Sequence, residues 1–387
     1  SHLQTAVITV QNAYAQLEAE GYLYTREKRG YYVADVERHP AAPGRAPARS
    51  APQPQRSWLL DLSSGGSGTE DFPFSVWAKL MRRVLSEEGE ALLRATPPNG
   101  ADALRRAIAQ HLYRFRGISA APEQIVVGAG TEYLYNLIVQ LLGREAVYGV
   151  EDPGYSKAAR IYALGGARTA PVLVDEGGVS LRSLEMSGAQ ILHTSPNHQF
   201  PTGAVTPIGR RQSLLRWAEA REGRYIIEDD YDSEFRFTLR PIPTLQSIDR
   251  AGRVIYVNTF SRTLAPSLRI SYMVLPRQLL DEFYKKLSFY SCTVSNFEQY
   301  TLAKFIQEGY FEKHINRLRN YYHSKRDALI TAIRNSRLND FVTISGEEAG
   351  VHFLMKIETS QPEEKLIQSA GTQSIKMAPL SGYYHVP

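Results

Sequence analysis

The chain has very little cysteine and no long apolar run, and each absence narrows what it can be. Cys292 is the only cysteine among 387 residues, which excludes an intrachain disulfide and a thiolate metal cluster. The longest wholly apolar runs span a few residues, so no segment is expected to cross a membrane. No basic stretch followed by an apolar one opens the sequence, so no secretory signal is expected, and a reducing cytoplasm is the expected location.

Neither positive nor negative charge is in large excess. The 45 lysines and arginines nearly balance 40 acidic residues, and a formal net charge of +5 permits nucleic-acid binding without indicating it. A charged fraction of 22% and an aromatic fraction of 10% are ordinary for a folded protein, which excludes a disordered or fibrous chain. The length suggests two or three domains.

Composition divides the chain into three parts. Residues 1–36 have the pattern of a small folded unit. Residues 37–57 are rich in proline, alanine and arginine and contain almost no bulky apolar side chain, so they are expected to form an extended linker. Residues 58–387 have the pattern of one large α/β domain.

Short β-branched runs alternate with helical patterns in the large domain. We expect strands at 124–127, 145–150, 189–193, 225–228 and 254–258, and helices that include 131–142, 208–221 and 299–332. Such alternation predicts a mainly parallel sheet flanked by helices. Ligands of these sheets bind at the carboxyl ends of the strands. The candidate ligand-binding residues of this chain directly follow predicted strands.

The N-terminal unit combines a helix with a basic hairpin. Apolar residues from Val7 to Leu17 recur at helical spacing, and Gly21 is a stop signal. Two aromatic-rich runs in 22–33 flank a charged turn and predict a β-hairpin. This order is the second half of a winged helix-turn-helix, although a helix and hairpin that only pack on a neighbour would give the same pattern.

The residues of this unit resemble the GntR family of bacterial regulators. The resemblance implies that the helix is a recognition helix and the hairpin a wing, so that the chain begins inside its DNA-binding domain. Recognition helices contact base edges and basic wings contact phosphates. The implied DNA-binding residues are Gln4, Thr5, Thr9, Gln11, Asn12, Arg26, Lys28 and Arg29.

Four segments of the large domain carry candidate ligand-binding groups. Residues 127–131 (VGAGT) form a strand-to-helix turn suited to a phosphate. Residues 226–232 (IIEDDYD) end a strand in carboxylates that could hold a protonated ring nitrogen. Residues 259–269 include a serine and an arginine that could both donate to a phosphate. Residues 195–203 (SPNHQFPTG) form a polar loop.

Each segment alone has a plainer interpretation. The glycine turn is compatible with ordinary turn chemistry, the serine and arginine with a surface pair, and the polar segment with a simple loop. The carboxylates could form a solvated acidic loop or a site for a divalent metal. No histidine-rich ligand spacing supports a metal, so no metal site is predicted.

Together, these segments are similar to fold-type I pyridoxal-phosphate (PLP) enzymes of the class I aminotransferase group. With the N-terminal unit, they resemble the MocR subfamily of GntR regulators, and the motifs EDPGY (151–155) and EDDYDSEFR (228–236) add to the match. The resemblance implies an aminotransferase-like fold with a smaller subdomain, a homodimer, and a C-terminus that stops short of the family's last elements. The implied cofactor-binding residues are Ala129, Gly130, Thr131, Tyr155, Asp229, Tyr231, Ser261, Arg262 and Arg269.

The resemblance also implies a role for most of these residues. Tyr155 would pack on the cofactor ring, Asp229 would pair with the pyridinium nitrogen, and Tyr231 would contact the ring hydroxyl oxygen. The 129–131 turn, with Ser261 and Arg269, would bind the phosphate.

Arg262 departs from the family pattern. It occupies the position of the lysine that forms the Schiff base, and a guanidinium is always protonated and cannot act as an amine nucleophile. PLP is therefore expected to bind non-covalently or as an external aldimine with an amino compound. The arginine is either natural or an introduced Lys→Arg change.

The sequence thus favours a regulator over an enzyme. The expected function is a PLP-sensing transcriptional regulator that binds an operator with repeated half-sites and responds to a small amino compound. The alternative is a PLP-dependent aminotransferase with an N-terminal appendage, and a third possibility is a dimerisation domain that binds no cofactor. The effector, the operator and the regulated genes cannot be inferred from the sequence.

Overall fold

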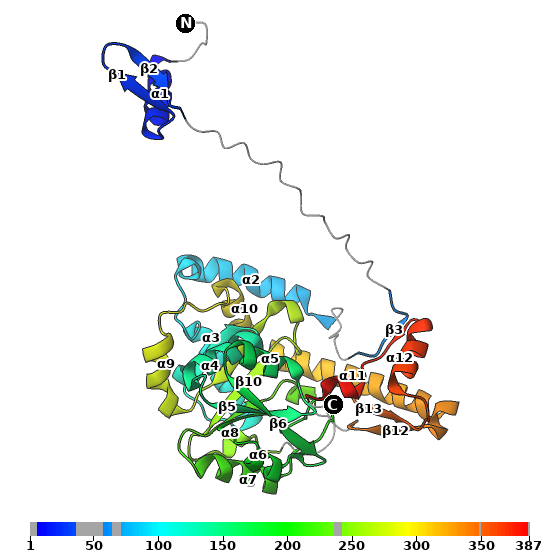
Figure 1. Cartoon of the computed structure of the whole chain (residues 1–387). Coiled ribbons are helices and arrows are strands. Elements are labelled where there is room, and N and C mark those ends of the chain that lie inside the picture. Colours follow the sequence, from blue (N-terminus) through cyan, green and yellow to red (C-terminus); the bar gives the residue numbers. More distant parts are fainter. Residues whose placement is uncertain (1–5, 36–56, 64–70, 236–241, 348–349, 386–387) are drawn as a thin grey trace. The chain divides into compact units, whose positions relative to one another are not determined.

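The computed structural model describes residues 6–35, 57–63, 71–235, 242–347 and 350–385 (Figure 1). The chain divides into two compact units, Ser1–Ser57 and Trp58–Pro387. Among the described residues, none of the helices combines the length and apolar character needed to span a bilayer.

The first unit consists of one helix and one hairpin. Helix α1 (Val7–Ala19) is followed by strands β1 (Leu23–Arg26) and β2 (Gly30–Val33), which pair antiparallel. The rings of Tyr14 and Tyr31 lie 4.9 Å apart between their centroids and join the helix to the hairpin. The Arg26 guanidinium lies 5.1 Å from the centroid of the Tyr32 ring, a cation–π contact that supports the hairpin.

The second unit is built on a sheet of eight strands in the order β4-β11-β10-β9-β8-β5-β6-β7. The central strands from β10 to β6 are parallel, whereas β11 pairs antiparallel with both β4 and β10. The strands are β4 (Ile125–Ala129), β5 (Val147–Asp152), β6 (Arg168–Asp175), β7 (Gly178–Val179), β8 (Ile191–Thr194), β9 (Tyr225–Asp229), β10 (Val254–Thr259) and β11 (Ile270–Val274).

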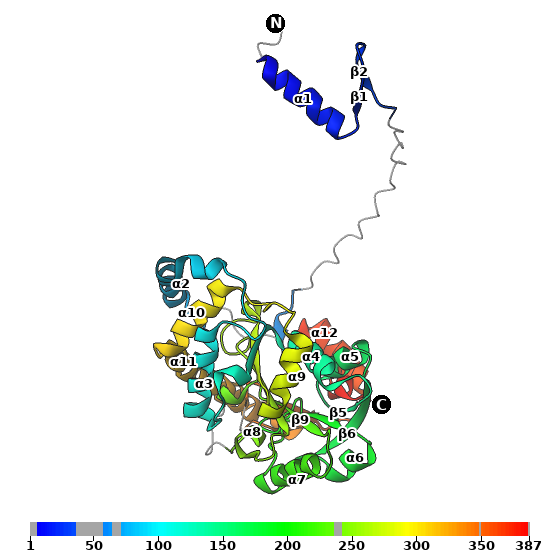
Figure 2. The ribbon, with the colours of Figure 1, turned by 90° about the vertical axis from the view of Figure 1, so that its left-hand side faces the viewer.

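Helices cover both faces of this sheet (Figures 1 and 2). Side chains alternate along each strand, so Val126 packs with α4, α5 and α9, whereas Val127 packs with α2, α3 and α10. Helices α6, α7 and α8 cover the same face as Val127 farther along the sheet, where they pack on β6, β7, β8, β9 and β10. The helices are α2 (Phe74–Glu88), α3 (Asp102–Arg116), α4 (Thr131–Leu142), α5 (Ser156–Leu164), α6 (Leu181–Met186), α7 (Ile208–Glu219), α8 (Leu245–Ile248), α9 (Leu280–Leu287) and α10 (Asn296–Gln307).

A smaller subdomain follows the large sheet. Helix α11 (Tyr310–Arg334) leads into the antiparallel pair β12 (Val342–Ser345) and β13 (Leu354–Ile357), and then into helix α12 (Glu363–Thr372). Strand β3 (Leu60–Asp61) pairs in parallel with β14 (Ile375–Lys376), so the two ends of the second unit meet in one short sheet.

The helix pattern and the number of strands both differ from the sequence-based prediction. The expected helix at 299–332 is two helices, because Gly309 adopts a φ of +75° between α10 and α11, a conformation that glycine tolerates at no steric cost. Strands β6, β7 and β11 of the large sheet were not predicted, and the antiparallel β11 places residue 269 beside residues 129 and 130.

Arg211 anchors the loop that carries the SPNHQFPTG segment. Its side chain is fully buried on α7 and donates to the carbonyl oxygens of Pro196, Thr206 and Pro243 and to Oδ1 of Asn197. Its guanidinium also lies 3.9 Å from the buried carboxylate of Glu228.

Replacing Arg211 should therefore destabilise the second unit severely. Arg211→Ala leaves several carbonyl groups without their donor and removes the cation beside the buried carboxylate of Glu228, which should lower the free energy of unfolding by about 3–5 kcal/mol. The exposed Arg216→Ala on the same helix serves as the control, with an expected change below ~0.5 kcal/mol. Equal urea-unfolding free energies for the two variants would contradict this role of Arg211.

Candidate functional site

Asp229 ends β9 as a carboxylate held inside the protein. The residue is 6% exposed, and its Oδ2 accepts a hydrogen bond from the Tyr135 hydroxyl at 2.5 Å. The Nε2 of His193, on the neighbouring strand β8, lies 3.4 Å from the same oxygen. The Tyr162 hydroxyl lies 2.7 Å from Nδ1 of His193, so if Tyr162 donates there, Nε2 carries the proton that points toward Asp229.

The other oxygen of Asp229 has no such support. Oδ1 is buried and has no hydrogen-bond partner among the described residues. A buried acceptor without a donor costs about 1–3 kcal/mol, so such an atom is unusual in a well-packed core. A protonated heterocyclic nitrogen is a donor that would satisfy it, because the carboxylate also stabilises the positive charge.

A hydrogen-bonded path joins Asp229 to the start of α4. Burial raises the pKa of Tyr135 well above its ordinary value, and the negative charge of Asp229 acts in the same direction, so the phenol remains a donor. The side chain of Thr131, one helical turn earlier, also hydrogen-bonds to the Tyr135 oxygen. The predicted nitrogen-binding carboxylate and the predicted phosphate-binding turn thus share one intervening side chain.

The 129–131 turn has the geometry of an anion site. Helix α4 begins at Thr131, and its first backbone N–H groups have no partner within the helix and lie at the positive end of its dipole. Gly130 has a φ of +93°, and a Cβ there would lie 2.4 Å from a guanidinium nitrogen of Arg269. The backbone N–H of Ala129 donates to the Thr293 hydroxyl at 2.9 Å and serves the loop.

An acidic side chain shares this region with Arg269. Glu132 accepts hydrogen bonds from Arg269, at 2.8 Å, and from Lys157. The hydrogen bond from Lys157 lowers the pKa of the Glu132 carboxyl, against the opposing effect of burial. Lys157, Arg269 and the positive end of the α4 dipole therefore lie next to the Glu132 carboxylate. This gathering of positive charge makes the surface of the turn suited to anions.

The aromatic residues of the predicted site lie in one neighbourhood. The ring of Phe200 is 6.3 Å from the rings of Tyr155 and Tyr231, measured between centroids. Burial raises the pKa of Tyr231 well above its ordinary value and raises that of Tyr155, while the charge of Arg262 opposes both shifts. Arg262 is therefore near both phenols.

Ser261 and Arg262 form part of the turn that follows β10. The backbone N–H of Ser261 donates to the Thr259 hydroxyl at 3.1 Å, and both residues are partly buried. Arg269 ends the same connection with a φ of +48°, immediately before β11. The pairing of β11 with β4 then places Ile270 opposite Ala129, which brings the two predicted phosphate-binding segments together.

The carboxylates after β9 are not a solvated acidic loop. Asp230 is 1% exposed and accepts from Arg116 at 2.6 Å, from Asn197 at 2.6 Å and from Tyr256 at 2.5 Å. Asp232 is 2% exposed and lies 2.8 Å from Nδ1 of His198. Each of these carboxylates has an interior partner, which makes the segment a structural support of the site.

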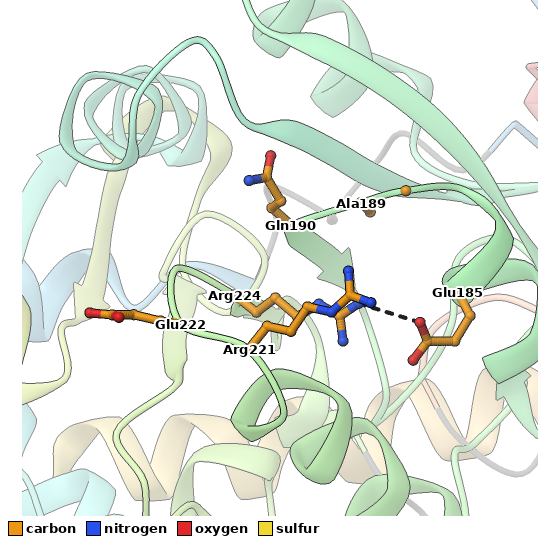
Figure 3. A pocket seen from close by; sticks show the side chains of 7 residues that line it. Glu185, Ala189, Gln190, Arg221, Glu222 and Arg224 are labelled. Atoms are coloured by element: carbon orange, nitrogen blue, oxygen red, sulfur yellow. Dashed lines mark hydrogen bonds and ion pairs between the residues drawn. The ribbon is translucent and has the colours of Figure 1, made fainter.

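A separate hollow lies at the opposite edge of the sheet (Figure 3). It is lined by residues just before β8 and just before β9, including Glu185, Gln190, Arg221 and Arg224. Arg224 donates to Glu185 at 3.3 Å. Because ligands of parallel sheets bind at the carboxyl ends of strands, we do not assign the cofactor to this hollow.

The predicted DNA-binding residues belong to the first unit. Gln4 and Thr5 lie outside the described residues. Thr9, Gln11 and Asn12 are exposed on α1. Arg26, Lys28 and Arg29 are exposed at the end of β1 and in the hairpin turn.

Sequence reasoning missed the residues that support Asp229. Tyr135 and Tyr162 belong to the apolar patterns of α4 and α5, where an aromatic residue is expected in the core, and His193 lies within a buried strand. The one available signal was the spacing of Thr131 and Tyr135, which places both on the same face of a helix.

Comparisons with known proteins agree with this geometry. The family described as aminotransferase class I and II matches residues 59–381. The α-aminoadipate aminotransferase LysN of Thermus thermophilus, solved with N-(5'-phosphopyridoxyl)-L-leucine, superposes with a TM-score of 0.74 at 25% identity, over 84% of this chain and 83% of that one.

Proteins named as regulators match the chain over both units. The uncharacterized HTH-type transcriptional regulator YdeL of Bacillus subtilis is 38% identical, over 100% of this chain and 84% of that protein. The probable rhizopine catabolism regulatory protein MocR of Rhizobium meliloti is 35% identical, over 98% and 80%. The pyridoxine biosynthesis regulator PdxR of Corynebacterium glutamicum is 30% identical, over 97% and 80%. The chain therefore belongs to the MocR subfamily of GntR regulators, whose large domain has the aminotransferase class I and II fold.

The buried carboxyl of Glu234 should make stability depend on pH. Burial raises its pKa to about 7 from an ordinary 4.5, with a further contribution from Asp230. The folded state therefore binds a proton that the unfolded state releases, so this group's contribution to stability falls as pH rises from about 4.5 to about 7.

Glu234→Gln removes that titration. Relative to the variant, the unmodified chain should lose up to ~3 kcal/mol of unfolding free energy between pH 5 and pH 8. Urea unfolding of both proteins at one-unit pH steps measures the difference. A difference that stays constant across this range, or that grows in favour of the unmodified chain, would contradict a raised pKa.

Proposed function

We propose that this chain is a transcriptional regulator whose large unit binds PLP without a covalent bond and passes the binding signal to a DNA-binding N-terminal unit. The observation that carries the proposal is the unpartnered Oδ1 of Asp229, joined through Tyr135 to an anion-binding helix start. A cofactor with a basic ring nitrogen and a phosphate has complementary groups for both sites. PLP supplies an electron-accepting ring when it is bound.

Each residue of the site would contact a different part of PLP. Asp229 would accept from the protonated ring nitrogen, and His193 and Tyr135 would fix the carboxylate. The backbone at the start of α4, with Arg269 and Ser261, would bind the phosphate, while the N–H groups of Ala129 and Gly130 hold the turn through Thr293 and Gly128. Tyr231 would donate to the ring oxygen.

Tyr155 and Arg262 would complete the pocket. Tyr155, which is 41% exposed, would cover the ring. Arg262 would add a fixed positive charge beside Tyr231 and Tyr155 and would not form a bond to the ligand.

The rest of the proposal concerns DNA and assembly. We infer that α1 contacts base edges and the hairpin contacts phosphates, through the exposed residues Thr9, Gln11, Asn12, Arg26, Lys28 and Arg29. Pairing of two large units would present two such units to an operator with repeated half-sites in the cytoplasm. A small amino compound that prefers one conformer would shift the equilibrium between DNA-binding states.

The rival function is an aminotransferase with an N-terminal appendage. Arg262 favours the regulator, because it occupies the position where the resemblance expects the Schiff-base lysine, and a guanidinium does not attack an aldehyde. Transamination also needs a base near the reacting carbon, and an arginine remains protonated at neutral pH.

Binding of PLP should depend both on the residue opposite the ring nitrogen and on the residues that bind the phosphate. Asp229→Asn removes the charge opposite the ring nitrogen, and Arg269→Gln removes a phosphate donor, so each should weaken PLP by at least tenfold. Equilibrium dialysis with PLP measures this, and Arg277→Gln is the matched control, since Arg277 lies beyond the end of β11 opposite to Arg269. Unchanged affinity in both site variants would refute the assigned pocket.

The mode of attachment can be tested at Arg262. Arg262→Lys supplies an amine that can condense with the PLP aldehyde with loss of water. Borohydride reduction followed by mass spectrometry should then find a phosphopyridoxyl group on residue 262 of the variant. The unmodified chain should bind PLP and show no labelled lysine after the same treatment. Labelling of any lysine in the unmodified chain at full occupancy would contradict non-covalent binding.

A further inference from the structure

Two histidines and an aspartate from three distant segments converge beside Tyr231. His198 comes from the polar loop after β8, Asp232 from the segment after β9, and His352 from the residues before β13. One ligand-type atom of each residue lies within 4.8 Å of the others. The centroids of the two imidazole rings are 4.5 Å apart.

Both imidazoles are fixed through one nitrogen. Nδ1 of His198 lies 2.8 Å from Oδ2 of Asp232 and 3.2 Å from the Tyr231 hydroxyl. The ring of His352 hydrogen-bonds to the Pro201 carbonyl, and since its Nε2 has no partner, Nδ1 is the donor. Each Nδ1 therefore carries its proton, and each Nε2 presents a lone pair.

The two lone pairs have no partner among the described residues. Nε2 of His198 and Nε2 of His352 are both buried and make no hydrogen bond. His198 as a whole is only 3% exposed. Two enclosed acceptors without a donor, on rings whose centroids lie 4.5 Å apart, are groups that a metal ion would satisfy.

Gly350 fixes the His198–Asp232 pair. It adopts a φ of +69°, and a Cβ there would lie 2.3 Å from Nδ1 of His198 and 2.5 Å from Oδ2 of Asp232. The backbone at residue 350 thus covers the Nδ1 side of this pair, and only glycine permits such a close approach.

We propose that His198 and His352 bind a divalent first-row transition-metal ion, such as Zn²⁺, through their Nε2 atoms. Imidazole nitrogen is a preferred ligand of these ions. Metal-binding histidines usually donate their second nitrogen to a carboxylate or a backbone carbonyl, which is how Asp232 and Pro201 hold these rings.

Two protein ligands leave coordination positions for water or for a ligand in the adjacent cleft. A metal ion at this site would therefore lie next to the Tyr231 hydroxyl and could regulate the protein from there. The evidence for this site does not rest on PLP binding, because it comes from His198, His352 and Asp232, of which His198 also contacts the Tyr231 hydroxyl.

The pattern was not visible in the sequence. The two proposed ligands lie 154 residues apart in the chain, so no short ligand spacing exists to recognise.

Competition between the full chain and a chromogenic chelator for added Zn²⁺ tests the proposal. The unmodified chain should bind one Zn²⁺ per chain. His198→Ala and His352→Ala should each bind at least tenfold more weakly, and Asp232→Asn 10–100-fold more weakly, because it disturbs the outer partner. His323→Ala is the matched control, since His323 is exposed and ion-paired on α11, and it should bind as the unmodified chain does.

X-ray absorption of the Zn²⁺-loaded unmodified chain keeps the test valid if a variant fails to fold. Two imidazole nitrogens per zinc at about 2.0–2.1 Å are expected. Binding that survives both histidine substitutions, a spectrum without imidazole, or no binding at all would overturn the site.

Discussion

A buried carboxylate with one satisfied oxygen and one unsatisfied oxygen is the constraint on which the large unit depends. Oδ2 of Asp229 is held by Tyr135 and His193, which come from a covering helix and a neighbouring strand. Oδ1 has no partner within the described chain. Because the two supports fix the carboxylate, the free oxygen keeps one direction, and a ligand gains the energy of pairing with it without the cost of ordering it.

The arrangement follows from the topology of the sheet. The parallel strands β8, β9 and β10 end at one edge, so the side chains that follow them gather there. The antiparallel β11 returns beside β4 and delivers Arg269 to the start of α4. Buried ion pairs such as Arg116–Asp230 support this edge from within. They fix the positions of side chains more than they stabilise the fold, since desolvation offsets much of their attraction.

The sequence predicted the parts of the fold that depend on short-range pattern. The five expected strands and the helix at 131–142 are present within a few residues of their predicted bounds, because buried parallel strands and amphipathic helices have distinct periods. The break at Gly309 and the direction of β11 were not predicted, since both depend on tertiary packing.

The candidate site was predictable only in part, for a related reason. Gly130, Asp229 and Arg269 stand in sequence patterns that mark strand ends, and the resemblance to a family assigned their roles. Tyr135 and His193 stand where a core residue is expected, and only their contacts reveal that they orient Asp229. His198 and His352 lie far apart in the chain, so their proximity is a property of the folded structure alone.

The proposed regulator and its rival enzyme share this fold, and the proposal distinguishes them by Arg262. The most direct measurement is a crystal structure of the chain with PLP. The account predicts the ring nitrogen within hydrogen-bond distance of Oδ1 of Asp229, the phosphate at the start of α4 beside Arg269, and no continuous density between the ligand and residue 262. PLP bound elsewhere, in the opposite orientation or joined covalently to the chain would contradict it.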